Sequence, residues 1–232
     1  MLLNFNHELI EIEIIRSKRS TLCISIKEDG TVVVKAPSFI QDAKIRELVE
    51  NKAEWILSKR KEVIQHQSKK MKREYVNGAT LPYMGKEVPM EIIVGKKSSV
   101  QLENHGFVIY TSNTEEEFMQ KLLKKWYKKQ SMDYLTTRVA YYSQKMNVSY
   151  TSISIKSRKK QWGTCDNQGN LTFSWRLIMA TDACIDYVVV HELCHRKHMD
   201  HSKQFWGEVK KMLPDYKERE KWLNDNSVNL TL

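Results

Sequence analysis

The sequence predicts an α+β protein in which a β-rich N-terminal part with one helix, residues 1–112, precedes a second domain, residues 113–232. Three observations support this prediction. Short alternating segments separated by turn residues fill most of the first part, and a long apolar stripe with helical spacing opens the second. A histidine cluster then lies on a further predicted helix, after two short predicted strands. The second domain is thus expected to combine helices with a small mixed sheet.

The N-terminal part begins with segments typical of strands. Apolar residues alternate at Leu22, Ile24 and Ile26, and the run Val32-Val33-Val34 follows Asp29-Gly30, a dipeptide that favours a hairpin turn. From residue 42 to residue 65 apolar side chains recur every three or four positions, which predicts one helix. Glycines and prolines then separate short strands up to Tyr110.

The second domain opens with a predicted helix start. Thr114 and Glu117 have the spacing of a capping box, in which each side chain binds the backbone at the other residue. The apolar stripe that follows keeps helical spacing to Met146. Two short strands are expected around Ile153 and over Leu171–Trp175, and a second helix is expected to start at residue 181 or 182.

The composition is that of a globular protein without a membrane span. Of the 232 residues, 41% are hydrophobic and 28% are charged, which excludes collagen-like and wholly disordered chains. No apolar segment reaches the roughly 20 residues of a membrane helix, and no secretory signal is visible. We therefore expect a cytoplasmic protein with no membrane partner. The four cysteines show no C-x-x-C spacing, which predicts free thiols.

Positive charge is in excess, with 38 Lys and Arg against 28 Asp and Glu, a net charge of +10. Such a balance fits either solvated basic faces or a surface that binds nucleic acid. The basic clusters are Lys59-Arg60-Lys61, Lys69-Lys70, Lys72-Arg73, Lys96-Lys97, Lys124-Lys125, Lys128-Lys129 and Arg158-Lys159-Lys160.

Four of the seven histidines lie between positions 191 and 201. On a helix, His191 and His195 stand one turn apart and can direct their nitrogens at one metal ion. Glu192 lies about 100° further round the helix, close enough to bind a water on that metal. This is the position of a general base.

Local propensity does not favour a helix before His191, because Val188-Val189-Val190 is a β-branched run that is typical of a strand. In a strand, however, His191 and His195 would lie roughly 13 Å apart, too far to share one ion. Burial of an apolar helix readily overrides weak propensity. The metal-binding hypothesis therefore predicts a helix here.

A catalytic zinc ion needs three protein ligands and one open position. His198 and His201 compete for the third place. We expect His201, because a bend at Met199-Asp200, with a left-handed His198, would bring it beneath the metal. Two alternatives stay open: histidines that bind no metal, and a structural zinc held by Cys194 and His198.

Several segments together resemble the YgjP-like metallopeptidases, a zincin family related in motif to SprT-type and WLM-type proteases. The resemblance implies a zincin-like metallopeptidase domain with an active-site helix, one zinc ion bound by His191, His195 and His201, and a catalytic Glu192. The matching segments are residues 16–20, 29–34 and 36–37, Gln161-Trp162-Gly163-Thr164-Cys165, Trp175-Arg176-Leu177, His191-Glu192-Leu193-Cys194-His195, His201-Ser202 and Phe205-Trp206.

The predicted reaction is hydrolysis of peptide bonds in a protein or peptide by a metal-bound water that Glu192 activates. The resemblance makes Leu171–Trp175 a candidate edge strand for an extended substrate, and an ordinary internal strand is the alternative. Arg158, Arg176 and His198 are candidate oxyanion donors. Two other functions remain: a zinc-dependent nucleotide or phosphoanhydride hydrolase, and a nucleic-acid-binding module with a structural zinc.

Overall fold

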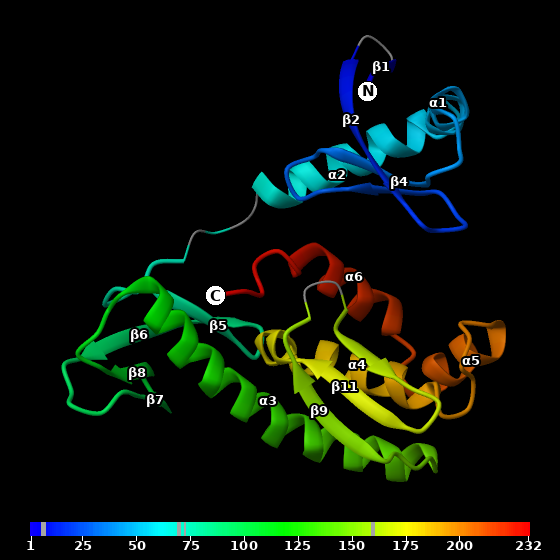
Figure 1. The fold of residues 1–232 in the computed structure, drawn as a ribbon. Helices are drawn as coiled ribbons and strands as arrows, with labels where there is room; N and C mark the ends of the chain where they lie inside the picture. The colour runs from blue at the N-terminus through cyan, green and yellow to red at the C-terminus, as the bar shows by residue number, and fades with distance from the viewer. Residues whose placement is uncertain (6–7, 69–70, 72, 159–160) are drawn as a thin grey trace. The chain divides into compact units, whose positions relative to one another are not determined.

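The chain forms two compact units, Met1–Lys70 and Met71–Leu232, in the computed structural model (Figure 1). The structure describes residues 1–5, 8–68, 71, 73–158 and 161–232. Five lysines of the predicted basic clusters lie outside these residues, namely Lys69, Lys70, Lys72, Lys159 and Lys160. Within the described ranges, no helix has the length and apolar character to cross a membrane. The predicted α+β class is confirmed.

Unit 1 is a four-stranded sheet, ordered β1-β2-β4-β3, with two helices. Strand β2 pairs parallel with β4, and the outer strands pair antiparallel with their neighbours. The buried core joins Ile10, Ile12, Val32, Ile45 and Ile56 from both layers. The elements are β1 Leu2–Phe5, β2 Glu8–Ser17, β3 Cys23–Ile26, β4 Val32–Pro37, α1 Asp42–Glu50 and α2 Ala53–Ser68.

The predicted hairpin is confirmed, and the predicted single helix is wrong. Strands β3 and β4 pair around a turn in which Gly30 has φ +84° and Asp29 accepts the backbone N–H of Thr31. The segment 42–65 contains two helices instead of one, because the chain turns at Asn51-Lys52. Asn51 keeps right-handed helical dihedrals, so the apolar spacing continues across the break and does not reveal it.

Unit 2 begins with a four-stranded sheet that packs on a 31-residue helix. The order is β5-β6-β8-β7, and the Tyr127 hydroxyl of the helix donates to the Pro82 carbonyl of β5 at 2.7 Å. The elements are β5 Thr80–Tyr83, β6 Lys86–Ile93, β7 Ser99–Glu103, β8 Gly106–Tyr110 and α3 Glu116–Met146.

The division between the units therefore differs from the expected boundary at residue 112. Phe107 and Ile109 of β8 share one buried core with Met119 and Leu123 of α3. A sheet face of this kind must be covered, and α3 covers it. Residue 113 marks only a change from strand to helix.

The start of α3 also differs from the expected capping box. The helix begins at Glu116, and its N-cap residue, Glu115, makes no side-chain cap hydrogen bond. Asn113 instead accepts the backbone N–H of Glu115 at 2.8 Å. The predicted apolar stripe is confirmed, since most of its residues are buried along the helix from Met119 to Met146 and the others are half-buried.

A second sheet, ordered β10-β11-β9, precedes the remaining helices. Strand β11 lies in the middle, parallel to β9 and antiparallel to β10. Helix α4 contacts α3, α5, α6 and the edge strand β10. The elements are β9 Ser152–Lys156, β10 Gly163–Cys165, β11 Asn170–Ser174, a 3-10 helix Trp175–Met179, α4 Asp182–Cys194, α5 Lys203–Met212 and α6 Tyr216–Asn226.

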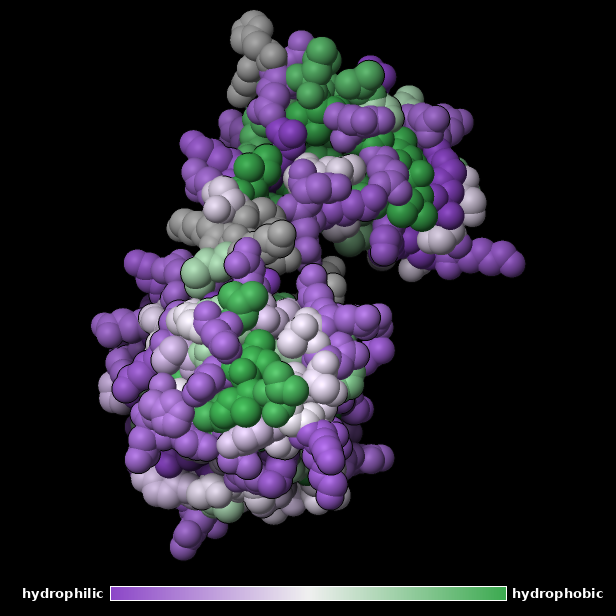
Figure 2. All heavy atoms as spheres, turned by 90° about the vertical axis from the view of Figure 1, so that its left-hand side faces the viewer, coloured by the Kyte–Doolittle hydropathy of each residue, from purple (hydrophilic) through white to green (hydrophobic). Residues whose placement is uncertain are grey.

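Hydrophilic side chains cover much of the face that Figure 2 shows, with a patch of apolar side chains on unit 2 and further apolar side chains on unit 1. Exposed apolar residues on and beside the sheet β5–β8 include Ile93, Val94 and Leu102. These three residues do not line the cavity described below.

Candidate metal centre

Helix α4 forms at the predicted place despite its β-branched run. Thr181 is the N-cap, and its hydroxyl accepts the backbone N–H of Cys184 at 3.3 Å. Val188, Val189 and Val190 are all buried. Burial of these side chains outweighs their strand propensity, which is worth only a few tenths of a kcal/mol per residue.

An ion pair fixes α4 against α3. The Arg138 guanidinium donates to both carboxylate oxygens of Asp186, each at 2.7 Å, and the Tyr142 hydroxyl donates to the same carboxylate at 2.9 Å. Paired bonds of this geometry set the direction of both side chains. The histidines one and two turns further along α4 thus project from a rigid element.

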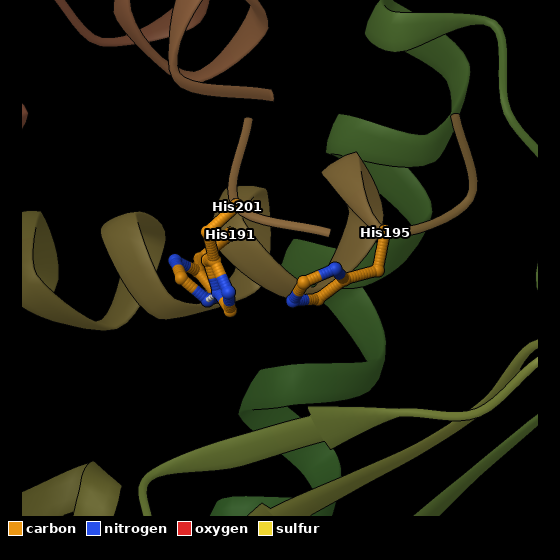
Figure 3. Close-up of side chains that lie close together, drawn as sticks. All are labelled: His191, His195 and His201. Atoms are coloured by element: carbon orange, nitrogen blue, oxygen red, sulfur yellow. Dashed lines mark hydrogen bonds between the residues drawn. The ribbon is translucent and has the colours of Figure 1, made fainter. Parts of the chain in front are cut away.

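His191, His195 and His201 come together as predicted (Figure 3). One nitrogen of each ring lies within 4.8 Å of the other two, and the Nε2 atoms of His191 and His201 are 3.1 Å apart. A tetrahedral zinc ion about 2.05 Å from each nitrogen would separate these atoms by about 3.3 Å. The three residues therefore fit a single metal ion.

The backbone of His198 orients His195. The Nδ1 atom of His195 lies 3.1 Å from the His198 carbonyl oxygen, so an Nδ1–H proton leaves Nε2 for a metal. The His198 ring is not part of the cluster. The expected left-handed conformation of His198 is wrong: among the described non-glycine residues only Met84 and Asn147 have positive φ. A turn over residues 195–197 and a bend at residues 199–200 reverse the chain instead.

The alternative zinc site at Cys194 and His198 finds no support in the described residues, where only the three imidazoles form a cluster of possible ligands. Cys194 is fully buried, and desolvation raises the pKa of its thiol to about 12. Burial therefore opposes the loss of the proton that a zinc–thiolate bond requires.

Glu192 lies beside the histidines in the same cavity, which has a volume of about 440 Å³. Its exposed fraction is 5%. Burial raises the pKa of this carboxyl to about 8, and the charge of Arg158 acts in the opposite direction. A cation held by the imidazoles would lower this pKa in the same way as Arg158.

Burial also keeps two of the imidazoles neutral. Desolvation, followed by the neighbouring His195 and His201, lowers the pKa of His191 to about 4. Desolvation likewise lowers the pKa of His195. Metal binding requires neutral imidazole, so these ligands need not lose a proton at neutral pH.

The contribution of His191 to the stability of the metal-free protein should decrease as the pH falls from 6.5 to about 4. In this window the unfolded chain binds a proton at His191 that the folded chain does not, which lowers the free energy of unfolding by up to about 3 kcal/mol. The raised pKa of Glu192 acts in the opposite direction between about 8 and 4.5, so the effect of His191 is measured as a difference between two proteins. In urea unfolding with a chelator, the free energy of unfolding of the wild type minus that of His191→Gln should fall with decreasing pH, and the same difference for exposed His105→Gln should stay constant. A pH-independent difference for His191→Gln would contradict the assignment.

The cavity is lined by two segments that sequence reasoning did not assign to the site. Residues 161–165 line it from the side of β10, and Tyr187 and Val188 line it from α4. Tyr187 lies one helical turn before His191, so helical spacing alone could have placed it near the site. Gly163 and Cys165 belong to a segment that the sequence analysis used only as part of the family resemblance.

The three oxyanion candidates do not line this cavity. Arg176 donates to the Ser227 carbonyl at 2.8 Å and also binds the Leu230 carbonyl, so its guanidinium holds the C-terminal segment. Arg158 donates to the Gln161 side chain at 2.9 Å and thereby reaches the rim of the cavity. His198 contributes its carbonyl to His195.

Metal-dependent hydrolases use such a helix, with two histidines one turn apart, a neighbouring carboxylate and a third ligand from a later segment. The fold and the site place the protein in this class. The chain belongs to the YgjP-like family, because the profile of the YgjP-like metallopeptidase domain matches residues 20–226. It is thus a metallopeptidase, and the family implies a divalent metal and a protein or peptide substrate.

Two solved structures are similar to part of the chain, and both are crystal structures of metallopeptidase zymogens. Abylysin of Pyrococcus abyssi is 22% identical over 38% of this chain and 90% of its own, with a TM-score of 0.36. Jannalysin of Methanocaldococcus jannaschii is 19% identical over 38% of this chain and 92% of its own, with a TM-score of 0.35. No curated protein matches the chain.

Proposed function

We propose that this metallopeptidase depends on one zinc ion, held by His191, His195 and His201, and that Glu192 is its general base. The observation that carries the proposal is the convergence of three imidazoles and one buried carboxylate on a single cavity. Three nitrogen ligands with one open position is the arrangement of catalytic zinc sites.

A zinc ion bound by these three histidines would supply Lewis acidity toward the scissile carbonyl and would increase the acidity of water. Glu192 accepts the proton of the attacking water and then delivers it to the leaving amine. The Glu192 carboxylate is shielded from bulk solvent. The same carboxylate can therefore exchange a proton first with the attacking water and then with the leaving amine.

The substrate backbone is proposed to add to β10. Leu171–Trp175 was a candidate edge strand, with an ordinary internal strand as the alternative, and β11 lies between β9 and β10 with both edges occupied. Strand β10 has one edge paired with β11, and it lines the cavity next to Glu192. An extended peptide that adds to its outer edge would present a carbonyl to the site.

The proposal predicts zinc-dependent cleavage of an unfolded protein such as casein. The zinc-loaded protein should generate new N-termini, detected by mass spectrometry, and chelator-treated protein should generate none until zinc is restored. A panel of nucleoside triphosphates and a labelled oligonucleotide tested in parallel distinguish the other functions.

Release of phosphate or pyrophosphate without proteolysis would mean that the protein is a phosphoanhydride hydrolase and not a peptidase. Oligonucleotide binding that is insensitive to Glu192→Gln, with no hydrolysis of either substrate class, would mean that the protein is a nucleic-acid-binding module. Cleavage that survives complete removal of the metal would refute the metal-dependent mechanism.

A further inference from the structure

We propose that Gly163 is a positioning residue for Glu192. The inference rests on the proposed role of Glu192 as general base. Gly163 is the first residue of β10 and lines the cavity, and the side chain of Glu192 lies directly against it. The absence of a side chain at residue 163 leaves the volume that the carboxylate arm occupies.

The space at this position is too small for any side chain. A Cβ atom built on Gly163 would lie 2.6 Å from Oε1, 2.7 Å from Cγ and 2.9 Å from Cδ of Glu192. These are its three nearest heavy atoms, and such separations lie well inside the 3.5–4.0 Å of favourable carbon contacts. An alanine at residue 163 would therefore force either Glu192 or β10 to move.

Backbone conformation does not explain this glycine. An added Cβ would come closer than 3.0 Å to a neighbour at two other glycines, Gly85 and Gly106, but these have φ of +77° and +142°. Their left-handed conformations already favour glycine. Gly163 has no positive φ, so other residues could adopt its backbone conformation. Contact with Glu192 is the remaining reason for glycine here.

The strand side of the contact is held in place, so the clash would displace the Glu192 side chain. Glu192 is 5% exposed and borders the cavity, so an added Cβ atom would push its carboxylate away from its present position. Strand β10 is held on its other side by pairing of Gly163 with Phe173, and the Trp162 carbonyl accepts the Ser174 N–H at 2.8 Å.

Arg196 adds a third restraint, because it donates to the carbonyls of Ser149 and Asn167, each at 3.1 Å. The bond to Asn167 ties the turn between β10 and β11 to the segment just after α4, and the bond to Ser149 ties the segment before β9 to the same place. Strand β10 therefore stays in place, and its contact with Glu192 fixes the position of the carboxylate.

A double-mutant cycle in metal-free protein tests the contact without any assay of activity. Gly163→Ala should lower the urea midpoint in the wild-type background and cause little shift in the Glu192→Ala background, since the three clashing atoms are then absent. If the single variant fails to fold, the double variant should fold. An equal loss in both backgrounds, or an unfolded double variant, would overturn the proposal.

Activity of the zinc-loaded protein gives the second readout. Gly163→Ala should lower kcat by about 100-fold with little change in KM or in zinc affinity. Gly207→Ala is the matched control, since a Cβ there meets nothing within 4 Å, and it should keep full activity. Full activity of Gly163→Ala would overturn the proposal. Absence of proteolysis in the wild-type protein would refute the proposed function, while the unfolding cycle still decides the contact.

Discussion

Glu192→Gln is expected to lower kcat for peptide hydrolysis by about 10²–10⁴-fold, the range that general-base catalysis contributes. Glutamine has nearly the same shape but cannot accept the proton of the attacking water. The metal site should persist, because Glu192 is not one of the three clustered ligands. Steady-state kinetics with an unfolded protein, together with the zinc content of the purified variant, would measure both effects.

The stability of Glu192→Gln shows whether its lower activity comes from the missing proton acceptor or from a damaged fold. Burial disfavours the charged carboxylate of Glu192, so a neutral amide should leave the free energy of unfolding of the metal-free protein unchanged or higher above pH 8. Glu117→Gln on the exposed start of α3 is the control and should keep full activity. Loss of zinc from Glu192→Gln would make Glu192 a ligand, and undiminished turnover would remove it from the mechanism.

The parts of the structure that follow from local chemistry could be predicted. Asp29-Gly30 specifies a tight turn through the one residue that readily adopts positive φ, and the turn is found there. The helix at residues 182–194 could be predicted against its valines because two imidazoles four residues apart can share a metal only on a helix. Both predictions needed no knowledge of distant segments.

The parts that depend on distant segments could not be predicted. Strand order is set by pairing between segments, so the alternation within Leu171–Trp175 could not show that β11 lies inside its sheet. The division at Lys70 reflects the packing of strands β5–β8 on α3, whereas the pattern along the chain changes most at residue 113. Likewise, only the fold shows that Gly163 contacts Glu192.

His201→Ala is expected to weaken zinc binding by more than about 100-fold, beyond the 10–100-fold that loss of an outer partner causes. Its Nε2 atom lies 3.1 Å from that of His191, at the place of a third ligand. His198→Ala should change zinc affinity by less than about 10-fold, because the group that orients His195 is the backbone carbonyl of residue 198. The alanine variant keeps that carbonyl.

Competition with a chromophoric chelator would rank the two affinities on the same scale. His201 is exposed, so its replacement should leave the urea midpoint of the metal-free protein close to that of the wild type, and zinc should raise that midpoint much less than in the wild type. Because the two histidines lie three residues apart on one connecting segment, the pair controls for a general disturbance of that segment. Equal losses would contradict the choice of His201. A larger loss in His198→Ala would mean that the chain reverses differently when metal is bound and would assign the third ligand to His198.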